Sequence, residues 1–258
     1  MSALHAIIAG PLSAWAGLVG WELVAGRAPV GLAVTAAFAV AARLLRSVTL
    51  GGAVAGAVVT FLLWIAWPPT FAALLTVFVL TAAATRVGYR RKQQLGTAER
   101  REGRSASQVL ANLFVATVAA LAATYLHQPL FLFGCAGALA EAAADTASSE
   151  MGQALSSEPF LITTFHPVPA GTNGGVSGPG TFAGIASALI VSGACVLARV
   201  VPGHGLLIAL IAGTAGMFLD SFLGATLERM RVLNNDQVNF TSTLFAAALA
   251  LVIAKLWL

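Results

Sequence analysis

The chain has 258 residues, of which 58% belong to the apolar set and 9% are charged, and its mean hydropathy is +0.86. Soluble domains have roughly 25% charged residues, so this chain has too few ionic groups to cover a soluble globule. The composition excludes a secreted disulfide scaffold, a disordered chain and an ordinary cytosolic enzyme, and it predicts an all-α, multi-pass membrane protein. The net charge of +4 does not indicate a nucleic-acid partner, because most basic residues lie in short segments between apolar runs.

Apolar runs close to the ~20 residues that a bilayer core requires recur along the whole chain. Their breaks predict nine helical spans in a single integral-membrane domain, 1–258: 3–25, 29–45, 50–67, 70–87, 108–126, 129–149, 180–199, 204–227 and 240–258. The first four spans, within 1–87, are expected to be peripheral, and the polar motifs fall in 88–258. The run at 3–25 is expected to be a span, since it has no basic start and is longer than the about 7–15 residues of a signal-peptide core.

The basic residues predict the orientation. If the N-terminus is cytoplasmic, eleven Lys and Arg residues fall on the inner side and three on the outer side. The inner set is Arg43, Arg46, Arg86, Arg90, Arg91, Lys92, Arg100, Arg101, Arg104, Arg229 and Arg231; the outer set is Arg27, Arg199 and Lys255. Because Lys and Arg are concentrated in cytoplasmic loops, we expect a cytoplasmic N-terminus. The long connections 88–107, 150–179 and 228–239 then share the cytoplasmic face, which favours a cytosolic ligand and the inner membrane of a prokaryote.

Acidic residues inside the predicted spans are the first candidates for function. A carboxylate in a membrane helix costs about 2.5–3.5 kcal/mol on insertion scales and is a functional candidate by default. Glu141 and Asp145 lie four residues apart on one helical face, and Asp220 lies at a depth similar to that of Asp145. A hydroxyl residue follows each aspartate directly, and such oxygen ligands suit Mg²⁺. The alternative is that arginines or helix ends neutralise the acids.

A glycine-rich connection, 166–180, is the second candidate. Residues 171–180 include five glycines and lead directly into the span predicted at 180–199. Exposed backbone amides at the positive end of a helix are suited to phosphate binding. The predicted nucleotide-phosphate contacts are Gly171, Thr172, Asn173, Gly174, Gly175 and Ser177. The alternative is a flexible connector.

Two further polar segments flank these motifs. The basic connection 88–107 ends at Arg104, after which Gln108 and Asn112 continue one polar helical face. The segment 234–239 has five polar residues in six at the start of the last span. For the basic cluster the alternative is a topological or lipid-headgroup role, and for 234–239 it is a helix cap.

Five motifs between 88 and 240 resemble those of the phytyl-phosphate kinase-like integral-membrane family. They are Gly103-Arg104 with Val109-Leu110-Ala111-Asn112, Asp145-Thr146 with Ser149-Glu150-Met151-Gly152, Gly171-Thr172-Asn173-Gly174-Gly175-Val176-Ser177, Asp220-Ser221 with Leu223-Gly224-Ala225, and Asn235 with Val238-Asn239-Phe240. The resemblance implies CTP-dependent transfer to an isoprenoid phosphate, as in a plant member that phosphorylates phytyl phosphate, and a distant relationship to dolichol kinases and phosphatidate cytidylyltransferases. The chain departs from the family at Ala147, where a tryptophan is usual, and at Ser148, where an alanine is usual.

Together these features predict a membrane kinase that uses CTP and Mg²⁺ to convert an isoprenoid monophosphate to the diphosphate. Asp145 and Asp220 are the expected metal ligands, with Glu150 or Asp236 as additional ligands. Lys92 and Arg104 are expected to neutralise phosphate oxygens. The expected substrate-binding residues are Gln108, Asn112, Asn235 and Asn239. A phosphate monoester is already an anionic nucleophile, so no general base is required.

Three alternatives stay open at this point. The first is an ion- or solute-coupled transporter in which Asp145, Asp220 and Glu141 form the ion pathway. The second is a cytidylyltransferase, which would release pyrophosphate instead of CDP. The third is a non-catalytic lipid-binding protein. Homo-oligomerisation is compatible with each of them.

Overall fold

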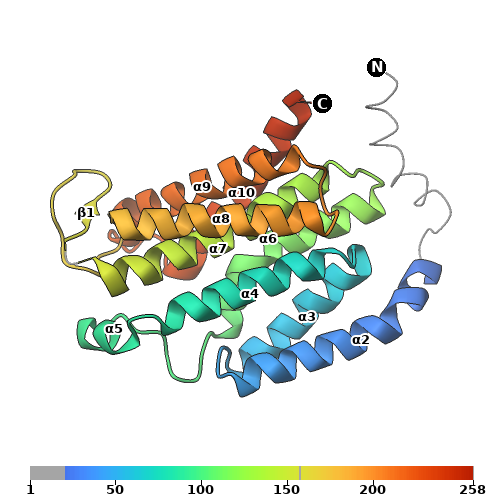
Figure 1. Cartoon of the computed structure of the whole chain (residues 1–258), viewed down its shortest axis with the longest axis horizontal. Helices are drawn as coiled ribbons and strands as arrows, with labels where there is room; N and C mark the ends of the chain where they lie inside the picture. Colours follow the sequence, from blue (N-terminus) through green and yellow to red (C-terminus); the bar gives the residue numbers. More distant parts are fainter. Residues whose placement is uncertain (1–20, 157, 258) are drawn as a thin grey trace.

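The computed structural model describes residues 21–156 and 158–257, and it confirms the all-α class. The helices are α2 (Trp21–Leu44), α3 (Leu50–Ala66), α4 (Thr70–Arg86), α5 (Tyr89–Leu95), α6 (Ala106–Tyr125), α7 (Phe131–Leu155), α8 (Gly178–Leu197), α9 (Gly205–Leu223) with a π-helical extension η2 (Gly224–Glu228), and α10 (Asn235–Trp257). Strands β1 (Phe160–Leu161) and β2 (Gly175–Val176) pair antiparallel in the connection between α7 and α8. The long helices form one elongated bundle (Figure 1).

Five helices of the described residues are long and apolar enough to cross a bilayer: Val24–Leu44, Ala106–Tyr125, Gly178–Leu197, Gly205–Glu228 and Asn235–Trp257. The bent pair α4 and α5, with 66° between them, would be a sixth, and α3 is a shorter apolar helix. Large apolar side chains such as Leu32, Val58, Phe114 and Phe182 are exposed on the outer faces. The chain is therefore a multi-pass membrane protein, while nine spans stay a prediction.

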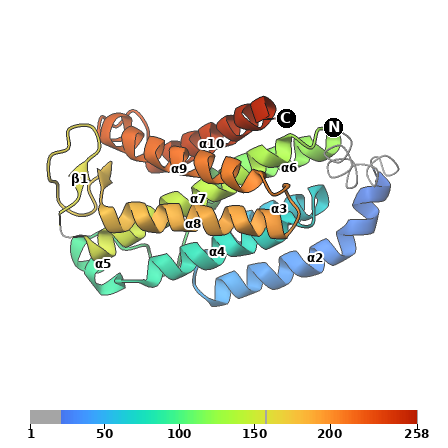
Figure 2. The same cartoon turned by 45° about the horizontal axis from the view of Figure 1, so that its top comes forward.

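Helix α7 is the centre of the bundle (Figure 2). It packs against α4, α6, α8, α9 and α10, and its residues 132–144 are all buried. Most of these residues are alanine or glycine, which allow neighbouring helices to approach closely. Where Gly137 and Gly213 stand, an added Cβ would lie 2.8 Å from a neighbouring alanine Cβ. Because other helices surround α7, it accommodates Glu141 and Asp145 without exposing them to lipid.

The predicted break between spans at 3–25 and 29–45 is wrong, because α2 continues from Trp21 to Leu44 with Pro29 inside it. The Arg27 guanidinium donates hydrogen bonds to the carbonyls of Ile65 and Ala66, at 2.7 and 2.8 Å. These carbonyls belong to the last turn of α3, where no further helical N–H is available to them, and that of Ala66 also accepts from Thr124 Oγ1. Arg27, which the sequence suggested as a loop residue, is thus accommodated within a helix. Residues 3–20 of the first predicted span lie outside the described residues.

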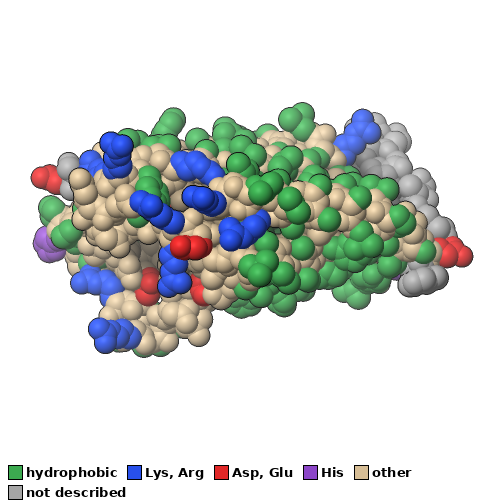
Figure 3. All heavy atoms as spheres, turned by 90° about the horizontal axis from the view of Figure 1, so that it is seen from below, with side chains coloured by type: hydrophobic (Ala, Val, Ile, Leu, Met, Phe, Trp, Pro, Cys, Tyr) green, Lys and Arg blue, Asp and Glu red, His purple; other side chains and the backbone are tan. Residues whose placement is uncertain are grey.

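Helices α3, α6, α8 and α10 begin at the same end of the bundle (Figure 1), each with a polar cap. Thr49 accepts from Gly52 N at 3.0 Å, and Ser177 accepts from Gly180 N at 3.2 Å. Ser105 and Gln108 form a reciprocal capping box, as do Asn234 and Gln237. Most of the visible arginine and lysine side chains gather toward this end, whereas hydrophobic side chains are most abundant along the middle of the visible face (Figure 3).

Candidate functional site

A polar pocket of about 220 Å³ lies at this charged end of the bundle. Its lining comes from the basic connection before α6, the start of α6, the last turns of α7, the connection 159–177, the α9–η2 junction and the start of α10. Asp145, Asp220, Arg104 and Gly171–Ser177, with the exception of Val176, all line it. The structure therefore brings together segments that the sequence separates by more than one hundred residues.

The two aspartates face each other in this pocket. The carboxyl groups of Asp145 on α7 and Asp220 on α9 lie within hydrogen-bonding reach of each other. Ser242 of α10 donates to Asp220 Oδ2 at 3.2 Å. Glu141 lies one turn deeper on α7, is 1% exposed, and lies near Ser242 and Asp145. The acids thus form a short column that opens into the pocket at Asp145.

Arg104 is held at the pocket by its own backbone. Its N–H donates to Ser47 O at 3.0 Å, and its carbonyl accepts from Thr49 N at 2.9 Å. Gly103 has φ +84°, and a Cβ at that position would collide with the backbone of Ser47 and Val48. The guanidinium lies near the Asp145 carboxylate and donates to Thr146 Oγ1 at 3.4 Å. That is the one hydrogen bond this five-donor group makes within the described chain, so donors are left for an anion.

The glycine-rich segment is a folded turn rather than a flexible connector. Gly171 and Gly174 have φ values of +88° and +78°, a region that favours glycine. A Cβ on Gly174 would collide with the backbone of Ala225 in η2, and one on Gly171 would collide with Thr97. These glycines therefore allow the turn to pack closely against η2 and the basic connection. The turn leads to Ser177 at the start of α8, whose amide end borders the pocket.

The structure departs from the prediction for Lys92. Lys92 is fully buried and lines neither this pocket nor the larger cavity beside it. Its ammonium donates to the carbonyls of Ala84 and Thr85, at 3.2 and 2.7 Å, and forms an ion pair with Glu150. All three of its N–H donors are thereby used. Lys92 holds the end of α4 and the Glu150 side chain, and it has no donor left for a phosphate.

The structure brings three of the four predicted metal ligands to the pocket. Asp145, Asp220 and Glu150 all line the pocket, but Glu150 is paired with Lys92. Asp236 lies in the first turn of α10, outside the pocket lining. Across residues 21–156 and 158–257, no group of three or more Asp, Glu, His or Cys side chains is arranged to hold a metal. Mg²⁺ commonly binds through one or two carboxylates, with waters and substrate phosphates as its other ligands. The Asp145–Asp220 pair fits that pattern.

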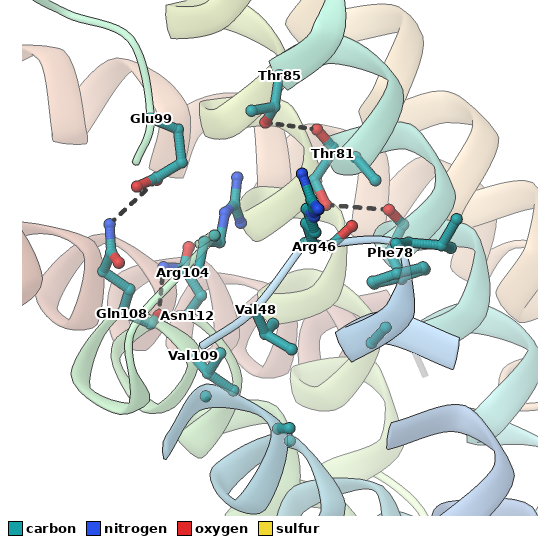
Figure 4. A pocket seen from close by; sticks show the side chains of 18 of the residues that line it. Arg46, Val48, Phe78, Thr81, Thr85, Glu99, Arg104, Gln108, Val109 and Asn112 are labelled. Atoms are coloured by element: carbon teal, nitrogen blue, oxygen red, sulfur yellow. Dashed lines mark hydrogen bonds between the residues drawn. The ribbon is translucent and has the colours of Figure 1, made fainter. Parts of the chain in front are cut away.

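The amide residues predicted to bind substrate line the pocket: Gln108, Asn112, Asn235 and Asn239. Gln108 also donates from Nε2 to Glu99 Oε2 at 3.2 Å, and Asn112 Nδ2 donates to Gln108 O at 2.9 Å (Figure 4). This chain of bonds orders one wall of the pocket beside Arg104. Whether these amides contact substrate stays a prediction.

Two acidic residues that line the pocket, Glu99 and Glu228, were not predicted from the sequence to be part of the site. Glu99 belongs to the basic connection, where its neighbours gave no sign of a special role, and its backbone carbonyl accepts from Tyr89 Oη at 3.0 Å. Glu228 lies at the end of η2. Its spacing of four from Gly224 was the available signal, although the π-helical turn changes the helical phase that this spacing assumes.

Comparison with known proteins identifies relatives over most of the chain. The family described as "Integral membrane protein DUF92" matches residues 33–247. An uncharacterized membrane protein of Synechocystis sp., sll0875, is 34% identical over 183 residues, which cover 69% of this chain and 71% of that protein. The uncharacterized membrane protein MJ0933 of Methanocaldococcus jannaschii is 33% identical over 182 residues, with 70% and 74% coverage.

A plant relative also matches. The chloroplastic protein VTE6 of Arabidopsis thaliana is 32% identical over 188 residues, which cover 69% of this chain and 56% of that protein. No solved structure matches. The family match over residues 33–247 includes the segments that form the polar pocket, from Glu99 to Asn239. The chain belongs to the DUF92 integral-membrane family, the phytyl-phosphate kinase-like family that its motifs resemble.

Proposed function

We propose that this protein transfers a phosphoryl group from a nucleoside triphosphate to an isoprenoid monophosphate and so forms the diphosphate. The observation that supports this most directly is the shared pocket: an aspartate pair, an arginine with free donors and a helix start preceded by a glycine-rich turn all line it. CTP is the donor that the family resemblance implies. The phytyl-phosphate kinase-like family supports an isoprenoid acceptor of this kind.

In the proposed reaction an oxygen of the acceptor monophosphate forms a bond to the γ-phosphorus. The bond from that phosphorus to the β–γ bridging oxygen breaks, and the nucleoside diphosphate leaves with the electron pair. Such a reaction needs alignment and charge stabilisation more than covalent chemistry by the protein. The amides of the glycine-rich turn and the start of α8 bind the donor phosphates, and the Arg104 guanidinium binds the acceptor phosphate.

Asp145 and Asp220 would hold Mg²⁺, which supplies charge neutralisation at the transferring phosphate oxygens. The chain's own contribution is to keep these two carboxylates side by side and to keep Arg104 against them. No protein base is needed for an anionic acceptor. Accordingly, His166 is exposed and does not line the pocket.

We further propose that the pocket faces the cytoplasm, where the nucleotide is available. The arginines at the pocket end, together with Arg199 and Lys255 at the other end of their helices, support this orientation. The Mg²⁺ requirement, the CTP preference and this orientation are parts of one proposal.

Two labelled forms of CTP test the proposal against cytidylyl transfer. The purified full chain is incubated with Mg²⁺, a prenyl monophosphate and CTP labelled at either the γ- or the α-phosphorus, and the lipid products are separated. Kinase activity places the γ-label, and not the α-label, in the lipid. Transfer of the α-label would establish cytidylyl transfer instead. If neither label reaches the lipid with CTP or with the other nucleoside triphosphates, the proposed function is wrong.

A further inference from the structure

A larger cavity of about 570 Å³ lies beside the polar pocket, among α2, α3, α4 and α6. Its volume falls within the about 300–1,000 Å³ typical of small-molecule sites. Its deeper lining is apolar and includes Phe38, Leu74, Val77 and Phe78. These helices belong to the part of the chain that the sequence suggested was peripheral.

The hydroxyl groups in this lining do not make the cavity polar. Thr60 donates to Gly56 O at 2.7 Å, Thr81 donates to Phe78 O at 3.3 Å, and Thr85 donates to Thr81 O at 2.8 Å. Each hydroxyl hydrogen is thus bonded to a carbonyl of its own helix, as Figure 4 shows for Thr81 and Thr85. The methyl groups and rings are left to face a ligand, which favours a hydrocarbon chain.

The mouth of the cavity has the opposite character. Six arginines line it at the charged end: Arg46, Arg86, Arg90, Arg100, Arg101 and Arg104. Glu99 is the one acid among the lining residues, and Gln108 donates to it. An apolar interior below a cationic mouth matches an amphiphile that has one anionic end.

The two cavities share one wall. Glu99, Arg104, Gln108 and Asn112 line both of them. Arg104 extends toward Thr146 on the polar side, while Val109, one helical position after Gln108, lines the apolar side. A ligand with its chain in the large cavity would therefore present its head to Arg104, beside the aspartate pair.

We propose that the cavity among α2, α3, α4 and α6 binds the hydrocarbon chain of a single-chain isoprenoid monophosphate and guides its phosphate to Arg104. This inference rests on the proposed function for the identity of the acceptor. It assigns to α2–α4 the selection of the acceptor chain, and it separates the lipid from the nucleotide by the wall that contains Arg104 and Asn112.

Gly56 provides a direct test, because a Cβ built on it meets no atom within 4 Å, although the residue lines the cavity. Gly56→Leu adds bulk to the cavity, and it removes a glycine from a helix interior, which favours the helix. Gly193→Leu on α8 is the matched control, since Gly193 also has no atom within 4 Å of its added Cβ and lines neither cavity.

The purified full chain and both variants are titrated in detergent with geranyl, farnesyl and geranylgeranyl phosphate, without nucleotide. We expect Gly56→Leu to lower the affinity for geranylgeranyl phosphate on the order of tenfold or more, because the added side chain occupies space in which methylenes of the lipid would otherwise be buried. Geranyl phosphate should be affected less, and Gly193→Leu should match the wild type. Unchanged affinity of Gly56→Leu for all three prenyl phosphates would overturn the inference.

A second measurement does not depend on a variant. A prenyl phosphate with a photoreactive group at the far end of its chain is crosslinked to the wild-type protein, and the labelled peptides are identified. Labels on α2, α3 or α4 support the inference, whereas labels confined to α8–α10 overturn it. Competition by a diacyl phosphatidate as strong as that by geranylgeranyl phosphate would contradict the single-chain assignment.

These readouts separate the inference from the proposed function. Prenyl-phosphate binding and crosslinking on α2–α4 without phosphoryl transfer would contradict the proposed function and support the lipid site. Phosphoryl transfer that Gly56→Leu leaves unchanged for every chain length, with crosslinks elsewhere, would keep the proposed function and remove the lipid site.

Discussion

Lys92 of α5 and Glu150 of α7 form an ion pair in which the lysine side chain is fully buried and the glutamate side chain is 12% exposed. The pair joins the basic connection to the central helix at the polar pocket, which Glu150 lines. Removing one partner of a buried pair leaves an uncompensated charge, which costs about 3–5 kcal/mol. The pair is therefore a stability determinant of the part of the protein that surrounds the site.

The first prediction concerns this pair. Lys92→Met should lower the thermal unfolding midpoint in detergent strongly, in line with that free-energy cost, and Lys92→Met combined with Glu150→Leu should recover much of the loss. Lys255→Met, at an exposed lysine near the end of α10, is the control and should leave the midpoint unchanged. Equal midpoints for Lys92→Met and the wild type would show that the pair contributes nothing to stability.

The second prediction concerns the aspartates. Asp145→Asn and Asp220→Asn should each lower kcat on the order of a hundredfold or more, because a bound metal ion contributes several kcal/mol of charge stabilisation. Asp236→Asn is the matched control, since Asp236 lies outside the pocket lining. Phosphoryl-transfer rates and the Mg²⁺ concentration dependence are measured for all three. A large loss in Asp236→Asn with full activity in Asp145→Asn would reverse the assignment of the metal ligands.

The third prediction concerns Arg104. Arg104→Ala should weaken binding of a prenyl monophosphate by about 1.5–3 kcal/mol, the contribution of a hydrogen bond to a charged group, while nucleotide affinity changes little. Arg104→Lys should recover only part of this, because lysine lacks the planar fork of donors. Arg229→Ala, which removes an exposed arginine outside both cavities, serves as the control. If Arg104→Ala weakens both ligands equally, the two phosphates occupy one merged site.

The fourth prediction concerns Gly174. Gly174→Ala should distort the glycine-rich turn, because φ is +78° and the new Cβ would meet the backbone of Ala225. We expect weaker nucleotide binding together with faster proteolytic cleavage within 159–177. Gly193→Ala, on α8 outside both cavities, has open space around its Cβ and should change neither measurement. Wild-type nucleotide affinity in Gly174→Ala would mean that the turn does not hold the nucleotide.

The sequence alone was sufficient to predict the membrane class and the convergence of the motifs. Apolar runs of bilayer length determine where the helices lie along the chain. Because successive spanning helices are antiparallel, every second connection lies at the same end of the bundle. That rule brings the starts of α6, α8 and α10 together with the ends of α7 and α9. The neighbouring positions of Asp145 and Asp220 follow from their similar depths on two such helices.

Only the tertiary structure determined the partners of individual side chains. Lys92 was predicted to contact phosphate, but α4 and α7 surround it and supply all its acceptors. Arg27 marked a loop in the sequence, yet two carbonyls at the end of α3 stabilise it within α2. Such pairings depend on which helix lies opposite, and the spacing of residues along one helix does not predict its neighbouring helix.

The larger cavity is likewise determined only by the tertiary structure. Phe38, Gly56, Val77 and Val109 belong to four different helices, and each of them is an ordinary apolar residue in its own segment. Small residues such as Gly56 and Ala42 line this space, and a Cβ built on Gly56 would meet no atom within 4 Å. Hydropathy along the chain determines that these helices are in the membrane, whereas the shape left between them is a property of their packing alone.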